Sequence, residues 1–357
     1  MGKLTISIDV MGGANAPHCV LEAVNNYLAK NKNVFFRLYG DSKRLESQLT
    51  HYANINSQNA QIHHCTQIVP DSEKPKDAFK NFKDSSMYKA VEAVKTGAAD
   101  ACISGGNTGA LLFTSHMILR TLENVKRPAL VGIYPNLKGG TVFLDVGANA
   151  ECDAINYFQF ALMGHCLAQV WLNKKTPSIA ILNVGSEETK GRDVERIAFQ
   201  MLKNTGLNFF GFVEGYDLAD GVVDVVVTDG FSGNLVVKTT EGSVSMVRSI
   251  IKGAFKGNYL SMLGGALAKG GFDKAFKVID PRNYNGAMFA GLNGIVVKSH
   301  GSSDAQAFFG AITKTVGLTQ SKINTKVAQL LGELHDIEAT AKVSLMTKIK
   351  QKLHIGE

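Results

Sequence analysis

Proline and cysteine are both scarce in this chain of 357 residues, which has 7 prolines and 5 cysteines. The cysteines are scattered and form no C-x-x-C pair, which argues against a disulfide-stapled secreted scaffold or a zinc ribbon. No apolar run approaches the ~18 residues of a membrane span, and Asp9 comes too early for a signal peptide. The sequence therefore predicts a cytoplasmic protein with reduced thiols.

Several nucleotide-binding and catalytic motifs are also missing. The chain has no G-x-G, so the usual dinucleotide fingerprint is absent, and its only Gly-Lys pair, Gly2-Lys3, excludes a Walker A loop. It has neither a G-x-S-x-G elbow nor an H-E-x-x-H zinc motif. The adjacent His63 and His64 point to opposite faces of a strand, which disfavours a metal site there. We expect neither a metal nor a cofactor.

The chain does contain a regular alternation of strand-like and helix-like segments. Hydrophobic residues make up 45% of it, enough to fill a sizeable core. The predicted strands cover residues 4–8, 34–39, 100–104, 141–145, 178–183, 222–228 and 295–299. The predicted helices cover residues 17–30, 42–51, 85–96, 108–121, 154–172, 193–204 and 304–315, with a long helical stretch from about residue 233. This order predicts an α/β fold whose mostly parallel sheet is covered by helices on both faces.

The same pattern predicts how the chain is organised. Residues 1–320 are expected to form a single α/β catalytic unit, and the Lys-rich, strand-poor residues 321–357 a peripheral C-terminal helix or tail. In parallel sheets, ligands bind outside the carboxyl ends of the strands. We therefore expect the unusual loops that follow the strands to gather at one edge of the sheet.

The loop Ser104-Gly105-Gly106-Asn107-Thr108-Gly109 lies between a predicted strand and an apolar helix. Its glycines let the backbone approach an anion, Asn107 or Thr108 can cap the helix, and the first-turn N–H groups face outward. A phosphate group suits such a site. The alternative is a tight turn that only caps a helix.

Two further loops carry groups suited to catalysis. The loop from Asp229 to Asn234, with Lys238 four residues on, brings together a carboxylate, an amide and an ammonium; the alternative is an N-cap and a turn. His300 follows another strand beside glycine and serines, where it is either a structural or a functional histidine. Residues 9–13 and 145–149 form similar loops.

Basic residues are concentrated in one amphipathic insertion at about residues 244–282. Seven Lys/Arg against Asp273 and Asp280 give +5 there, out of a net +7 for the chain. Apolar residues recur at helical spacing, and glycines interrupt the pattern. The segment favours an acidic partner or an anionic membrane surface over nucleic acid. The alternative is an ordinary surface hairpin with its apolar face on the core.

Taken together, these loops resemble the bacterial phosphate acyltransferase family, the acyl-ACP:phosphate transacylases of phospholipid synthesis. The matching segments are residues 8–13, 84–86, 104–110, 145–149, 183–191, 229–234 with Lys238, and 300–304. Two positions depart from the family pattern. Ala14 stands where the family usually has an acidic residue, and Asn285-Gly286-Ala287 where it often has two glycines before the alanine.

The resemblance implies a three-layer α/β/α architecture, similar to the isopropylmalate/isocitrate dehydrogenase type and found as homodimers that associate peripherally with membranes. It implies the reaction of acyl-ACP with inorganic phosphate, whose acyl-phosphate product feeds a membrane acyltransferase. Because acyl carrier protein is acidic, Arg248, Lys252 and Lys256 are predicted to steer its docking. Leu260, Leu263 and Leu267 are predicted to contact the acyl chain or lipid.

For this reaction we hypothesise a specific role for each loop. The predicted phosphate-binding residues are Ser104, Gly106, Asn107, Thr108 and Gly109, and the predicted catalytic residues are His300, Asn234, Lys238 and Asp229. Three alternatives stay open. They are a metal-dependent hydroxyacid dehydrogenase on the same fold, a phosphotransacetylase-like enzyme that uses acyl-CoA, and a non-catalytic protein that binds acyl or phosphoryl ligands.

Overall fold

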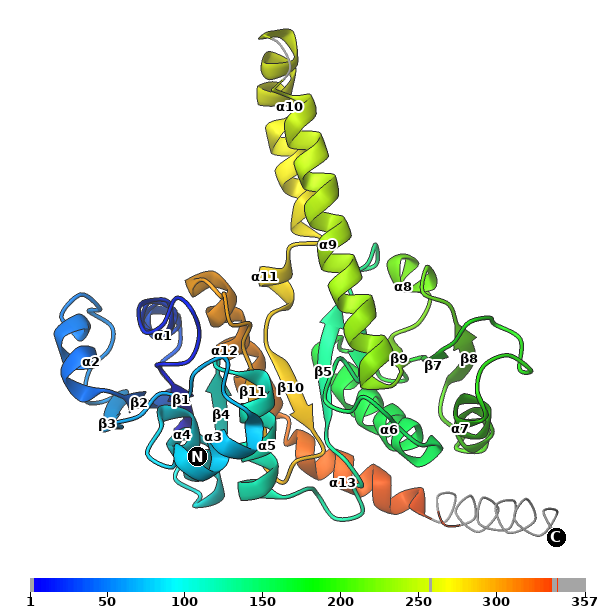
Figure 1. Cartoon of the computed structure of the whole chain (residues 1–357), viewed down its shortest axis with the longest axis horizontal. Coiled ribbons are helices and arrows are strands. Elements are labelled where there is room, and N and C mark those ends of the chain that lie inside the picture. The colour runs from blue at the N-terminus through cyan, green and yellow to red at the C-terminus, as the bar shows by residue number, and fades with distance from the viewer. Residues whose placement is uncertain (1–2, 257–258, 336–338, 340–357) are drawn as a thin grey trace.

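The computed structural model describes residues 3–256, 259–335 and 339, and within them all strands join one sheet (Figure 1). The strands are β1 (Leu4–Asp9), β2 (Val34–Gly40), β3 (Ala60–His64), β4 (Ala101–Ser104), β5 (Ala129–Tyr134), β6 (Thr141–Leu144), β7 (Ile179–Leu182), β8 (Phe209–Val213), β9 (Val225–Val227), β10 (Ala287–Ala290) and β11 (Ile295–Lys298). The helices are α1 (His18–Lys30), α2 (Ser42–Leu49), α3 (Pro75–Asn81), α4 (Ser86–Lys95), α5 (Thr108–Leu119), α6 (Ala154–Trp171), α7 (Asp193–Lys203), α8 (Asp217–Asp220), α9 (Gly230–Ala254), α10 (Tyr259–Lys277), α11 (Pro281–Tyr284), α12 (Ala305–Gln320) and α13 (Ile323–Glu333).

Helices cover both faces of this sheet, which confirms the predicted three-layer α/β/α fold. One face carries α1, α6, α7, α12 and α13, packed over the largest hydrophobic core. The other face carries α3, α4, α5 and the first half of α9, over two smaller cores. The buried strands read as nearly continuous apolar runs, as expected when both faces are covered.

The strands change direction in the middle of the sheet. The order is β3-β2-β1-β4-β11-β10-β5-β6-β9-β7-β8. Strands β3, β2, β1, β4 and β11 are parallel, but β10 is antiparallel to both its neighbours and β5 is antiparallel to β6. As a result β6, β9, β7 and β8 run opposite to β11.

This reversal corrects one expectation from the sequence. The loops after β1, β4 and β11 lie at one edge of the sheet, whereas the loops after β6, β7 and β9 lie at the opposite edge. Helix α9 starts beside β9, crosses the sheet over β5 and β6, and so links the two edges (Figure 1). Its crossing is marked by a hydrogen bond of 2.9 Å between the hydroxyl groups of Thr240 and Tyr134, at the end of β5.

Beyond the sheet, α9 continues into a helical hairpin with α10 that projects far from the body of the protein (Figure 1). No residue of α10 is buried. The two helices contact each other through the rings of Phe255 and Phe272, 5.4 Å apart, and through Arg248, which lies 5.1 Å from the centre of the Phe276 ring. Within the described residues, no helix combines the length and hydropathy needed to cross a bilayer.

The structure describes only part of the predicted C-terminal segment, residues 321–357. Helix α13 packs against α6 through buried Ile323, Val327 and Leu331. The rest of the predicted tail, residues 336–338 and 340–357, lies outside the described residues. The division into a unit of residues 1–320 and a separate tail stays a prediction.

Candidate active site

The glycine loop after β4 leads directly into α5, with Asn107 as its N-cap. The Asn107 side-chain oxygen accepts a hydrogen bond from the Ala110 N–H at 3.0 Å, and its amide donates to the carbonyl oxygens of Asp71 (2.8 Å) and Glu73 (2.9 Å). The side chain is thus engaged in holding the loop. The N–H groups of Thr108 and Gly109, which have no partner within the helix, and the hydroxyl of exposed Thr108 can therefore receive an anion.

A pair of buried charges lies beneath this loop. Asp9, Ser104 and Lys298 occupy neighbouring register positions at the carboxyl ends of β1, β4 and β11. The Ser104 hydroxyl donates to the Asp9 carboxylate at 2.6 Å and accepts from the Gly106 N–H at 3.1 Å. Lys298, 8% exposed, donates to the carbonyl oxygens of Gly105 (3.1 Å) and Ser299. Together they fix the backbone of the loop.

Burial shapes the titration of both charges. It raises the pKa of the Asp9 carboxyl, against the lowering effect of hydrogen bonds from Ser104 and Ser86. It lowers the pKa of Lys298 to about 8, against the raising effect of Asp9 and Asp71. Lys298 was not among the site residues predicted from the sequence. A lysine at the end of an otherwise apolar buried strand could have indicated it, because a lysine is rarely buried without a partner.

Three loops interlock at this edge through backbone contacts. A Cβ at Gly12 would collide with the Asp9 carboxylate and lie 2.6 Å from the Gly106 nitrogen, so only glycine fits there. The Ala14 N–H donates to the Gly301 carbonyl oxygen at 2.8 Å. Because this contact uses the backbone, it does not depend on the acidic side chain that the family usually has at this position.

His300 lies in the third of these loops, next to the glycine loop, since the Ser299 N–H donates to the Ser104 carbonyl oxygen at 2.9 Å. The Nδ1 atom of His300 accepts the Ser302 N–H at 3.2 Å, so in the neutral ring the proton is on Nε2. Burial is the main cause of its lowered pKa, to which Lys238 contributes and which Glu241 opposes. Lys238 and Glu241 both lie on α9, so this helix passes close enough to His300 for their charges to act on its ring.

Asn285, at one of the two positions that depart from the family pattern, supports the same loop. Its side-chain oxygen accepts the His300 N–H at 2.8 Å, and its amide donates to the Ser299 hydroxyl at 2.9 Å and the Ala307 carbonyl oxygen at 2.8 Å. Asn285 is buried. It therefore fixes the backbone conformation at His300.

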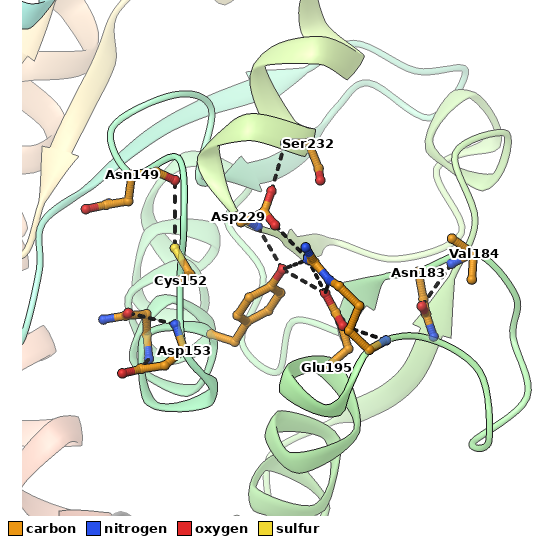
Figure 2. Close-up of polar contacts among 11 residues, drawn as sticks. Asn149, Cys152, Asp153, Asn183, Val184, Glu195, Asp229 and Ser232 are labelled. Carbon is orange, nitrogen blue, oxygen red and sulfur yellow. Dashed lines mark hydrogen bonds and ion pairs between the residues drawn. The ribbon is translucent and has the colours of Figure 1, made fainter.

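Asp229, at the opposite edge, is the N-cap of α9 and part of a buried polar network (Figure 2). Its carboxylate accepts the Ser232 N–H at 2.7 Å and pairs with Arg192 at 2.6 Å. Arg192 also pairs with Glu195, and the Tyr157 hydroxyl donates to Glu195 at 3.1 Å. Burial alone would raise the pKa of Asp229, but the hydrogen bonds from Arg192 and Ser232 lower it. The carboxylate is thus ionised and engaged in anchoring α9.

Asn234 and Lys238 are four residues apart and therefore share one face of α9. Asn234 packs against the loop after β6, where a Cβ at Gly147 would lie 3.5 Å from its own Cβ. Lys238 forms an exposed ion pair of 2.7 Å with Glu241, one turn further along. The structure thus brings the loop of residues 104–109, Lys298 and His300 together, with Lys238 in electrostatic range. Asp229 and Asn234 lie toward the other edge.

A cleft with a volume of about 490 Å³ lies beside Asp229. It is bordered by the end of β7, the start of α7 and the first turn of α9, including Asn183, Arg192 and Ser232 (Figure 2). The described residues contain no cluster of His, Cys, Asp or Glu that could hold a metal ion. The fold and these loops define an α/β/α protein with a glycine-rich helix N-terminus beside a histidine.

Comparison with known proteins specifies the class further. A family model described as fatty acid synthesis protein matches residues 4–326. The phosphate acyltransferase of Paramagnetospirillum magneticum is 42% identical over 339 residues, which cover 94% of this chain and 96% of the relative. That of Caulobacter vibrioides is 42% identical, covering 95% of each chain. The chain belongs to this family and is an enzyme of the phosphate acyltransferase type.

Solved structures agree on the fold. A phosphotransacetylase from Streptococcus pyogenes superposes with a TM-score of 0.58 at 17% identity, covering 89% of this chain and 94% of that one. The EutD phosphotransacetylase from Staphylococcus aureus superposes with a TM-score of 0.55 at 16% identity, with the same coverage. At this identity the likeness extends to the fold alone.

Proposed function

We propose that the enzyme transfers a fatty acyl group from the thioester of acyl carrier protein to inorganic phosphate, forming acyl-phosphate for membrane phospholipid synthesis. The observation that carries this proposal is the N-terminus of α5 beside His300, above the buried ammonium of Lys298. An oxyanion held there lies next to a group that can exchange a proton. The phosphate acyltransferases among the relatives support the same reaction.

Phosphate is the nucleophile, so no covalent enzyme intermediate is needed. The first-turn N–H groups of α5 and the Thr108 hydroxyl hold its oxygens, while Lys298 and Lys238 offset its charge. One phosphate oxygen attacks the thioester carbon, a carbon–oxygen bond forms, and the carbon–sulfur bond breaks. Fixing both reactants contributes several of the ~7–11 kcal/mol available from orientation.

His300 and Asn234 act on the acyl group in this scheme. The neutral His300 ring carries its proton on Nε2, from which it hydrogen-bonds to the departing sulfur and stabilises the charge developing there, a contribution of about 10²–10³-fold. The proton that the sulfur gains comes from the attacking hydrogen phosphate. The Asn234 amide donates to the oxyanion, at roughly 2.7–4 kcal/mol per donor. The Gly233 N–H is not a candidate, because it donates to the Asp229 carbonyl oxygen at 2.9 Å. Asp229 contributes indirectly, because it fixes the start of α9 on which Asn234 and Lys238 lie.

The decisive experiment is an assay with acyl carrier protein thioester and phosphate, followed by hydroxylamine trapping of the product. Wild-type enzyme is expected to form a trappable acyl-phosphate only when phosphate is present. His300→Gln should lower kcat at least 100-fold, whereas His116→Gln, exposed on α5, should not. Absence of a phosphate-dependent product from wild-type enzyme refutes the function; normal turnover by His300→Gln refutes the role of that residue.

Acyl-CoA is the alternative acyl donor, which a phosphotransacetylase-like enzyme would use. The phosphotransacetylase structures with the same fold favour keeping this candidate. Measuring kcat/KM for acyl-CoA and for the carrier thioester with the same acyl chain separates the two. We expect the carrier thioester to be preferred, because the exposed basic hairpin suits an acidic protein. A higher kcat/KM for acyl-CoA overturns the carrier assignment.

The hairpin is the proposed contact with carrier and membrane. Lys252 is exposed on α9 and Lys256 in the turn that follows this helix. Leu260, Leu263 and Leu267 are 82%, 60% and 81% exposed on α10. Basic residues near an anionic surface contribute about 1 kcal/mol each, enough for reversible attachment. We propose a cytoplasmic homodimer that associates peripherally with the membrane, where a downstream membrane acyltransferase consumes the product.

A further inference from the structure

The cleft beside the start of α9 has no part in the steps above. Its volume of about 490 Å³ is within the range of small-ligand sites, ~300–1,000 Å³. It opens where β7 and β9 end, at the sheet edge opposite the loop of residues 104–109. Among its lining residues, Figure 2 labels Asn183, Val184, Glu195 and Ser232.

The charges of the cleft disfavour an anionic ligand. The Arg192 guanidinium is paired with both Glu195 and Asp229, whose side chains are each 5% exposed. The guanidinium that lines the cleft is thus already neutralised by carboxylates on both sides. A phosphate dianion is better served at the other edge, where the ammonium of Lys298 is buried.

An uncharged acceptor, by contrast, fits the cleft. The Asn183 side-chain oxygen accepts the Val184 N–H at 2.9 Å, but its amide nitrogen is buried without a partner among the described residues. Gly191 packs against this amide so closely that a Cβ there would lie 2.9 Å from the nitrogen. A fixed, buried donor lacking an acceptor is costly, so a ligand carbonyl oxygen stabilises it. Leu182 and Val184 add apolar surface to the same wall.

We infer that this cleft binds the uncharged, amide-bearing arm that carries the acyl thioester. The Asn183 amide donates to a carbonyl of the arm, and Leu182 and Val184 cover its methylene groups. The inference rests on the proposed function and locates its donor substrate. Ser232, in the cleft wall, is six residues before Lys238, so about 9 Å of α9 separates the cleft from the part of the helix that passes near His300. An extended arm spans that distance and presents its thioester to the phosphate.

A labelling experiment tests the cleft directly. Val184→Cys introduces a thiol at a position that is 80% exposed in the wild-type protein, so the substitution should not disturb folding. Pantetheine, which has the arm without nucleotide, protein or phosphate, is expected to slow modification of this thiol at least fivefold, whereas inorganic phosphate should not. Glu188→Cys, exposed on the same loop, is the matched control and should stay unprotected. Unchanged labelling of Val184→Cys overturns the inference.

Kinetics of Asn183→Ala provide the second test. The variant should raise KM at least tenfold for carrier thioester and for acyl-CoA alike, since both contain the arm, and leave KM for phosphate within twofold. Glu188→Ala should change neither. A rise for only one donor, or for phosphate instead, overturns recognition of the shared arm. Failure of the proposed function would show as wild-type enzyme without acyl-phosphate product; failure of this inference would show as active enzyme whose introduced thiol pantetheine leaves unprotected.

Discussion

Lys298 is a charged side chain at the end of an otherwise apolar buried strand. Its ammonium has three N–H donors, two of which are used by the carbonyl oxygens of Gly105 and Ser299. We propose that the third donates to a phosphate oxygen. The cost of burying the charge is offset by Asp9 nearby and, when phosphate binds, by the substrate itself.

The pH dependence of phosphate use should follow Lys298. Because burial lowers its pKa to about 8, the ammonium is present below that pH and is lost as the pH rises through it. We expect kcat/KM for phosphate to fall above pH 8, and Lys298→Met to be at least tenfold lower below pH 8, without this fall. Lys314→Met is the control, since burial lowers the pKa of Lys314 to about 7 on the opposite face of the sheet. If Lys314→Met removed the fall instead, the assignment to Lys298 would be wrong.

Asn107 contributes to stability through both ends of its side-chain amide. Asn107→Ala removes a helix cap, about 1 kcal/mol, and two further hydrogen bonds of about 0.5–1.5 kcal/mol each. We expect the free energy of unfolding, measured by chemical denaturation, to fall by roughly 2–4 kcal/mol. Asn107→Asp keeps the capping oxygen and should lose less. Equal stabilities of the two variants would contradict the stabilising role of the capping oxygen.

The start of α9 is determined by close backbone packing. Gly233 lies against the carbonyl oxygen of Asp145, and an added Cβ would collide with it. Asp229 caps the helix at the same point. The position of this first turn decides where Asn234 and Lys238 lie relative to His300.

Gly233→Ala should therefore displace α9 and lower the free energy of unfolding by about 1–3 kcal/mol, with a large loss of acyl transfer. Gly242→Ala, further along the same helix and free of neighbours within 4 Å, should instead raise stability by up to about 1 kcal/mol. Thermal unfolding and kcat of both variants check this. A fully active Gly233→Ala enzyme would mean that the position of α9 is not critical.

The hairpin of α9 and α10 carries basic residues on a surface that projects away from the sheet and its covering helices (Figure 1). Replacing Arg248, Lys252 and Lys256 by Glu should raise KM for acyl carrier protein at least tenfold at low salt, leave kcat at saturating carrier unchanged, and have a smaller effect at high salt. Replacing the exposed Lys43, Lys95 and Lys138 by Glu changes the net charge equally and is the control. If both sets of substitutions raised KM equally, the cause would be the net charge of the protein and not the position of the basic residues on the hairpin.

Membrane contact is expected at the tip of the same hairpin. Leu260, Leu263 and Leu267 replaced by Ser should abolish co-sedimentation with vesicles containing anionic lipid, because each exposed leucine loses its apolar burial in the interface. Turnover of soluble carrier thioester should persist. Binding that survives these substitutions would place the membrane contact elsewhere.

Local sequence was sufficient for most of the elements and for the ends of the functional helices. The strand–helix alternation predicted the three-layer fold, and caps such as Asp229 and Asn107 follow from residues three or fewer positions away. Strands β5, β8 and β10 escaped prediction because they are short or interrupted by glycine, so their pattern is weak. The family was predicted from the order of its loops and is confirmed by the relatives.

Only the tertiary structure decided which loops meet. The antiparallel pairing of β10 and β5 depends on hydrogen bonds between distant segments, and it sends the loops after β6, β7 and β9 to the edge opposite His300. The position of Lys298 beneath Gly105, 193 residues away in sequence, and the pairing of Arg192 with Asp229 are likewise long-range. No local pattern encodes such contacts, because they arise from packing whole layers against one another.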